Sequence, residues 1–172
     1  MVIAYSAKGL RFKEVPVLDS ITSSSHFVGP MIFALAFAGV EMTEPKLLSM
    51  IVAFALWGMA SHAFGAVQDV RADREAGISS IATAIGARAT VRFSFIAYFL
   101  AGVALIPAGG LEAIAAIAAI PYLVIVGKFW NITDAECESA NKGWRRFIWL
   151  NFFAGFVVTI LLIVASMKLG FA

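Results

Sequence analysis

Long apolar blocks separated by short polar segments are the dominant pattern of the chain. Each block approaches the roughly 20 residues that a helix needs to cross about 30 Å of hydrocarbon. None alternates polar and apolar residues with the period of two that is typical of barrel strands. We therefore predict an all-α, polytopic transmembrane helix bundle that forms one domain over residues 1–172. The five expected spans cover residues 27–40, 47–67, 91–107, 111–126 and 147–167, the first being long enough only if residues 18–25 extend it.

Composition agrees with a membrane protein and excludes several other classes. Of the residues, 61% are hydrophobic and 14% are charged, whereas about a quarter are charged in a typical soluble domain. The mean hydropathy of +0.89 is more than a soluble fold could bury. The basic residues lie among acids and form no continuous stripe, so nucleic-acid binding is not expected. Cys137 is the single cysteine, which excludes an intrachain disulfide and a cysteine-based zinc site.

Basic residues are distributed unevenly among the polar segments. Only Lys46 and Lys168 lie after the first, third or fifth span, and the other segments contain all the rest. The positive-inside rule therefore predicts a multi-pass protein of the cell membrane, with the N-terminal segment and the loop after the second span in the cytoplasm and the C-terminus outside. The remaining basic residues are Lys8, Arg11, Lys13, Arg71, Arg74, Arg88, Arg92, Lys128, Lys142, Arg145 and Arg146.

Two carboxylates follow the second span at a spacing that indicates metal chemistry. Asp69 and Asp73 are four positions apart, so on a helical turn they share one face and repel each other unless a cation lies beside them. One or two carboxylates completed by water and phosphate oxygens are the usual Mg²⁺ arrangement. Arg71 and Arg74 could donate charge-assisted hydrogen bonds to phosphate. From the charge pattern alone, a solvated loop with local Asp/Arg pairs is an equally good interpretation.

The same segment carries a resemblance to a known family. Asp-x-x-x-Asp-x-x-x-Gly, completed here by Asp69, Asp73 and Gly77, resembles the second aspartate-rich motif of the UbiA superfamily of intramembrane prenyltransferases. Residues 79–86, Ser-Ser-Ile-Ala-Thr-Ala-Ile-Gly, resemble the continuation before that family's next helix. Gly77 would tolerate a left-handed helix cap.

The N-terminal segment extends the resemblance. Tyr5 and Ser6, followed by Arg11 and Lys13, resemble the basic segment before the family's fifth helix. The resemblance implies that the chain corresponds to the last five helices of a nine-helix fold, without the N-terminal helices and the first aspartate-rich motif. Residues 11–30 also resemble lycopene-elongase-type members, which add a five-carbon prenyl unit to the ends of lycopene.

The resemblance implies a prenyltransferase, an enzyme that transfers alkyl groups other than methyl. In this family Mg²⁺ binds the diphosphate of an allylic substrate, and a lipophilic acceptor captures the allylic cation. Asp69 and Asp73 would be the catalytic Mg²⁺ ligands, and the acceptor would be a carotenoid, a quinone precursor or a similar lipid. The other implied site residues are Arg11, Lys13, Lys8, Arg71 and Arg74 for the diphosphate, and Tyr5, Ser6 and His26 for the prenyl and acceptor pocket.

The sequence also departs from the family pattern. No substitute for the first motif is visible, since Asp134, Glu136 and Glu138 read as a solvated acidic turn. If these 172 residues act alone, we expect little or no turnover, because half of the metal site is missing. A transferase assay on the purified chain tests this expectation.

Two alternatives remain open at this stage. A small membrane transporter subunit could use the Asp/Arg loop and His62, which lies seven residues before Asp69 in the second span, as an ion path. For His62 a hydrogen bond between packed helices is the better interpretation. A truncated, non-catalytic paralogue could instead pack against an intact family member in the bilayer.

Overall fold

Helices form every regular element in the part of the chain that the computed structural model describes, residues 2–7 and 9–168. The α-helices are α1 (Val2–Ser6), α2 (Leu18–Phe37), α3 (Pro45–Val67), α4 (Val70–Ala76), α5 (Ile81–Ile85), α6 (Ala87–Leu105), α7 (Gly110–Ile114), α8 (Ala119–Gly127) and α9 (Asn141–Lys168). The 3-10 segments are η1 (Phe12–Glu14), η2 (Ile106–Ala108), η3 (Ala115–Ala118) and η4 (Asp134–Ala140).

Five of these segments are long and apolar enough to cross a membrane, which confirms the predicted number and order of spans. The first begins at Leu18, so residues 18–25 do extend it. The fourth is not one continuous helix, because η3 interrupts the α-helical hydrogen bonding between α7 and α8. The five candidate spans are Leu18–Phe37, Pro45–Val67, Ala87–Ala108, Gly110–Gly127 and Asp134–Ala165.

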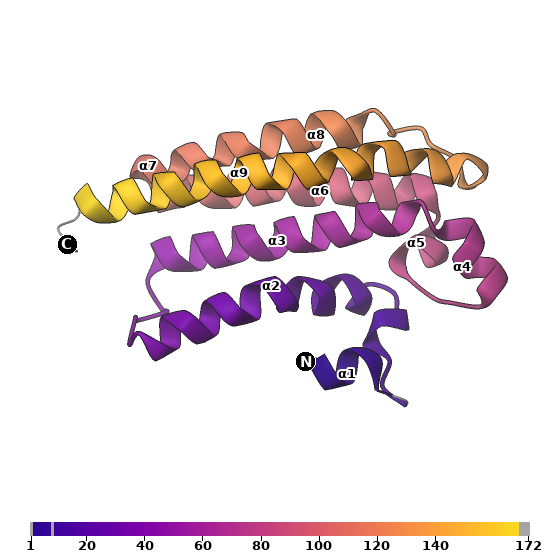
Figure 1. Cartoon of the computed structure of the whole chain (residues 1–172), viewed down its shortest axis with the longest axis horizontal. Helices are drawn as coiled ribbons and strands as arrows, with labels where there is room; N and C mark the ends of the chain where they lie inside the picture. Colours follow the sequence, from indigo (N-terminus) through magenta and orange to yellow (C-terminus); the bar gives the residue numbers. More distant parts are fainter. Residues whose placement is uncertain (1, 8, 169–172) are drawn as a thin grey trace.

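Helix α3 lies in the middle of the bundle, between α2 on one side and α6 with α8 and α9 on the other (Figure 1). Small residues permit its close contact with α2. A side-chain carbon added at Gly58 would come within 2.6 Å of Ser24 Oγ. That hydroxyl donates a 2.7 Å hydrogen bond to the Ala55 carbonyl across the two helices. Close approach through small residues and interhelical hydroxyl bonds is typical of helix packing in membranes.

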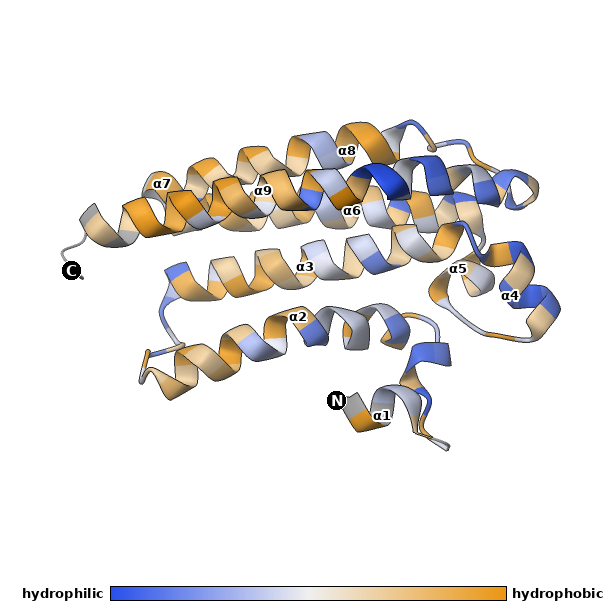
Figure 2. Ribbon diagram, in the orientation of Figure 1, coloured by the Kyte–Doolittle hydropathy of each residue, from blue (hydrophilic) through white to orange (hydrophobic). Residues whose placement is uncertain are grey.

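The bundle has two chemically different ends. Polar residues gather where α4, α5 and the start of α9 lie, whereas the helices beyond them are mostly apolar (Figure 2). We call the first the aspartate end, because it holds Asp69 and Asp73. The far end is the opposite one, where α3 begins and α7 lies (Figure 1). The aspartate end is built from short elements, and long spans form the rest of the bundle.

Candidate functional site

Asp69 and Asp73 lie one helical turn apart at the aspartate end. Asp69 is the N-cap of α4, and the Asp73 amide donates a 2.8 Å hydrogen bond to the Asp69 carbonyl. Gly77 ends α4 in the left-handed conformation, with a φ of 70°, as its place in the motif predicted. The Ile78 amide then donates back to the Asp73 carbonyl at 2.8 Å, which closes the turn.

The electrostatics of these two carboxyls suit a cation. Partial burial raises the pKa of both above the usual range, and the Asp69 charge adds to the rise in the pKa of Asp73. Neither forms an ion pair with another described residue. Within the described part of the chain no cluster of three or more metal-ligating side chains occurs. The pair therefore fits Mg²⁺, which needs only one or two carboxylates when water and phosphate oxygens complete its shell.

The neighbouring arginines contact the acidic turn η4. Arg74 Nη1 lies 2.6 Å from Asp134 Oδ2, and the guanidinium also donates to the Thr83 carbonyl. Asp134 Oδ1 accepts a 2.7 Å hydrogen bond from the amide of Ala87, the first residue of α6. The Asp134 side chain is 41% exposed, which is compatible with a solvated acidic turn, but its carboxylate also joins α4, α6 and η4.

The other two acidic residues of η4 also agree with the prediction of a solvated turn. Glu136 and Glu138 are exposed, as a solvated turn requires. Glu138 lies 3.9 Å from the exposed Arg71, a separation at which surface ion pairs contribute little stability. Diphosphate binding by Arg71 and Arg74 stays a prediction, and for Arg74 it would compete with Asp134.

Asp19 is a buried carboxylate that is not among the site residues predicted from the sequence. Its side chain is fully buried, and Oδ2 accepts a 2.8 Å hydrogen bond from the amide of Ile81, the first residue of α5. Oδ1 accepts from the Ser20 amide at 2.7 Å. Ser20 Oγ in turn lies 3.2 Å from His62 Nδ1. Asp19 thereby fixes the segment after the aspartate motif against the start of α2.

His62 makes the interhelical hydrogen bond that its position favoured. Its partner, Ser20, is fully buried. The sequence contains one indication of this cluster. Asp19 is the single acid within residues 18–25, which extend the first span. Its partner Ile81 is 62 residues away, and no local pattern connects the two positions.

The N-terminal segment brings two predicted pocket residues together. The Tyr5 and His26 rings meet edge to face with their centroids 5.0 Å apart. His26 Nδ1 lies 2.8 Å from the Thr22 carbonyl one turn earlier, so this nitrogen carries the proton and donates. Ser6 lies beside them in α1 and is exposed. Their role as the prenyl and acceptor pocket remains a prediction.

The basic residues of this segment have different surroundings. Arg11 pairs with Glu14, and Lys13 is exposed in η1. Lys8, also predicted to bind diphosphate, lies outside the described residues. Arg11 and Lys13 lie shortly before α2, and α2 begins at the aspartate end, where Asp19 accepts the Ile81 amide.

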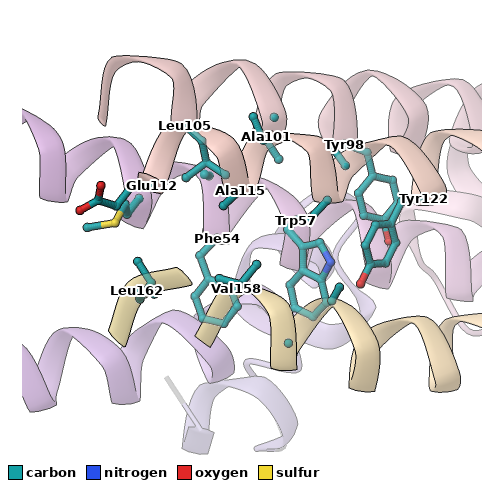
Figure 3. A pocket seen from close by; sticks show the side chains of 18 of the residues that line it. Phe54, Trp57, Tyr98, Ala101, Leu105, Glu112, Ala115, Tyr122, Val158 and Leu162 are labelled. Atoms are coloured by element: carbon teal, nitrogen blue, oxygen red, sulfur yellow. The ribbon is translucent and has the colours of Figure 1, made fainter. Parts of the chain in front are cut away.

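An apolar cavity of about 430 Å³ opens among α2, α3, α6, α7, η3, α8 and α9. Figure 3 shows Phe54, Trp57, Tyr98 and Tyr122 directed into it from three helices. The Tyr98 and Tyr122 rings stack at 4.9 Å, and Trp57 meets Tyr122 edge-on at 6.3 Å. The walls are otherwise mostly alanine, glycine and aliphatic residues, so the cavity suits a ligand without charge.

Comparison with known proteins identifies the family. The family model of the UbiA prenyltransferase family matches residues 1–153. The chain belongs to this family. With its five apolar spans, it is an integral membrane protein of the UbiA family. The transporter-subunit alternative therefore has no support from the comparison.

Curated relatives indicate which members of the family the chain is similar to. A lycopene elongase/hydratase from Corynebacterium glutamicum is 52% identical over 164 residues, which are 94% of this chain and 56% of that protein. A C(50) beta-cyclic carotenoids biosynthesis protein, LbtBC, from a Dietzia strain is 54% identical over 159 residues, 92% of this chain and 37% of that protein. A lycopene elongase/hydratase from Haloferax volcanii is 39% identical over 125 residues, 73% of this chain and 40% of that protein.

These relatives agree with the predicted lycopene-elongase-like subgroup of the UbiA family. The chain spans about half the length of the curated relatives it matches, or less. No solved structure matches the chain.

Proposed function

We propose that this chain acts in a membrane prenyltransferase that transfers a prenyl group from an allylic diphosphate to a linear carotenoid of the lycopene type. The observation that carries the proposal is the pair Asp69 and Asp73, held one turn apart beside an apolar bundle and unpaired with any described cation. The names of the relatives support a carotenoid as the acceptor.

Polar residues of this chain would bind the metal and the diphosphate, and its apolar spans would surround the allylic group. Asp69 and Asp73 would hold Mg²⁺, which neutralises charge that develops on the departing diphosphate. Arg11 and Lys13 would add donors to the phosphate oxygens. The apolar spans would exclude water that could otherwise capture the allylic cation.

The reaction balances without an oxidant or reductant. The bond between the allylic carbon and the diphosphate oxygen breaks, and its electron pair leaves with the diphosphate. A carbon–carbon double bond of the acceptor donates an electron pair to the allylic carbon and forms the new carbon–carbon bond. Loss of a proton from the acceptor then restores a double bond. Tyr5, at the edge of His26, would face the positively charged carbon, because an aromatic face attracts a cation.

The orientation in the membrane is part of the proposal. The distribution of basic residues supports a cytoplasmic position for the aspartate end, where water-soluble diphosphates would be available.

A binding experiment on the purified chain tests the function. Isothermal titration calorimetry would measure binding of dimethylallyl S-thiolodiphosphate, an unreactive allylic analogue, with Mg²⁺ and with EDTA. We expect Mg²⁺-dependent binding that the Asp69→Asn/Asp73→Asn double variant lacks. Binding that is the same in EDTA, or the same in the double variant, would contradict the proposed role of this site. Absence of binding by the wild-type chain would favour the non-catalytic paralogue.

A further inference from the structure

The apolar cavity begins far from the two aspartates. Along α3, the lining residue nearest the aspartate end is Trp57, twelve residues before Asp69, which corresponds to about 18 Å at a rise of 1.5 Å per residue. The lining continues to Met50, about 28 Å from Asp69 on the same basis. A five-carbon allylic group bound at the aspartates is too short to reach it.

The lining residues of α6 and α9 also lie far from the aspartate end. Tyr98 is eleven residues into α6, and Asn151 is ten residues into α9. At 1.5 Å per residue both lie roughly 15 Å or more from the aspartate end of their helices. The lining of α9 then extends to Leu162. The cavity therefore occupies the far half of the bundle.

Two groups of aromatic rings, which meet at the neighbouring residues His26 and Phe27 of α2, lie between the predicted reacting end and the cavity. Tyr5 contacts His26, and the next residue, Phe27, meets Trp57 at 5.8 Å and Phe54 at 6.5 Å between ring centroids. Phe54 and Trp57 stack at 5.6 Å and both line the cavity. These five residues offer an apolar surface along which a hydrocarbon chain can lie.

A partly buried ion pair marks the outer limit of the cavity. Glu112, in the first turn of α7, lines the cavity and pairs with Lys46 at the start of α3. Figure 3 shows its carboxylate at one end of the cavity, beyond Phe54 and Leu105. The Glu112 side chain is only 8% exposed. A hydrocarbon that reaches this pair gains nothing by extending further, because it would separate or desolvate two charges.

We propose that the cavity is the binding site for the distal part of a linear isoprenoid hydrocarbon whose reacting end lies at Tyr5 and His26. The proposal rests on the proposed function for the position of the reacting end. A carbon chain with bonds of about 1.5 Å advances roughly 1.2 Å per bond when extended. Along α9 the lining runs from Asn151 to Leu162, about 16 Å at 1.5 Å per residue, so filling the cavity requires roughly 14 bonds beyond the reacting end. The site selects acceptors with a long acyclic backbone.

Gly155 offers a way to fill the cavity without disturbing its walls. It lines the cavity from α9, and a side-chain carbon added there would meet nothing within 4 Å. Gly155→Phe should place a ring in the space meant for the hydrocarbon. Gly155→Ala is the matched control, because it also replaces the helical glycine but leaves most of the space open. Retained helicity by circular dichroism would show that both variants fold.

Native mass spectrometry of the detergent-solubilised chain would count bound lycopene. We expect the wild type and Gly155→Ala to retain lycopene, and Gly155→Phe to retain at least tenfold less at the same concentration. Equal retention by Gly155→Phe and Gly155→Ala would overturn the inference. It would also be overturned if Gly155→Phe lost a bound phospholipid and kept lycopene, because the cavity would then hold lipid acyl chains.

The two proposals can fail separately. Lycopene binding that depends on Gly155, in a chain that shows no Mg²⁺-dependent binding of the diphosphate analogue, would keep the cavity assignment and remove the proposed chemistry. Diphosphate binding that depends on Asp69, together with lycopene binding that Gly155→Phe does not change, would keep the proposed chemistry and remove the cavity assignment.

Discussion

The two ends of the bundle show how differently a polar site and an apolar site are built from helices. At the aspartate end, α4, α5 and η4 are short, and side chains such as Asp19 and Asp134 hold them by accepting backbone amide hydrogens. At the far end, four long helices and the interrupted fourth span surround a cavity whose walls are mainly small apolar residues. The aspartate end should therefore respond to the loss of single hydrogen-bonding atoms, and the far end to changes in side-chain volume.

The largest effect is expected at the metal-binding pair. Asp69→Asn removes one charged ligand while keeping the N-cap shape, so Mg²⁺-dependent affinity for the diphosphate analogue should fall on the order of 100-fold or more, beyond the usual cost of outer-shell changes. Calorimetry measures the loss. Glu75→Gln, an exposed acid in the same helix, is the control and should bind as the wild type does. Similar losses in both variants would mean that general negative charge, not this site, attracts the ion.

The next largest effect is expected at Asp19. Asp19→Ala leaves the buried amides of Ser20 and Ile81 without their acceptor, and each unsatisfied group costs about 1–3 kcal/mol. We expect a clear fall in melting temperature in detergent. Asp19→Asn keeps one acceptor oxygen and should lose less. A melting temperature unchanged in Asp19→Ala would show that this hydrogen-bonded link does not stabilise the aspartate end.

A smaller effect is expected for the ion pair between Arg74 and Asp134, which joins α4 to η4. The Arg74 and Asp134 side chains are 44% and 41% exposed, and exposed ion pairs typically contribute about 0.2–1 kcal/mol. Asp134→Asn keeps an oxygen that can accept the Ala87 amide. It should therefore cost about as much as Arg74→Gln, which also loses the hydrogen bonds to the Thr83 carbonyl. Chemical unfolding of both single variants and the double variant gives the coupling energy. If Arg74→Gln weakens diphosphate binding even when Asp134 is already Asn, Arg74 contacts the ligand directly.

The smallest effect is the pH dependence of the metal-free protein. Because the pKa values of Asp69 and Asp73 are raised in the fold, their stabilising contribution is present at acid pH and is lost as pH rises through the folded values. Without Mg²⁺, Asp69→Asn/Asp73→Asn should therefore melt slightly above the wild type at neutral pH, and the gap should close on acidification. A wild type that is the more stable at neutral pH without metal would contradict the raised pKa values.

The sequence predicted those features of the fold that depend on local pattern. Apolar blocks long enough to span a membrane gave the five helices, and the glycine at position 77 gave the left-handed end of α4. The interruption of the fourth span by η3 was missed, because alanine-rich residues 115–118 have no feature that distinguishes a 3-10 turn from an α-helix.

The candidate site was predictable only in part, for a physical reason. The spacing of Asp69 and Asp73 is a local signal, and so is the charge of Arg74. The partners of Asp19 and Asp134 are 62 and 47 residues away in sequence, so only the packed helices bring them together. The cavity is likewise a property of packing, since its lining comes from five spans.

The central claim is that Asp69 and Asp73 hold a divalent ion in contact with an allylic diphosphate. The most direct test replaces Mg²⁺ by Mn²⁺ and measures electron–nuclear double resonance of the purified chain with dimethylallyl S-thiolodiphosphate. We expect a ³¹P coupling to bound Mn²⁺ in the wild type and its loss in Asp69→Asn/Asp73→Asn. Mn²⁺ that binds without a ³¹P coupling, or a coupling that persists in the double variant, would contradict it.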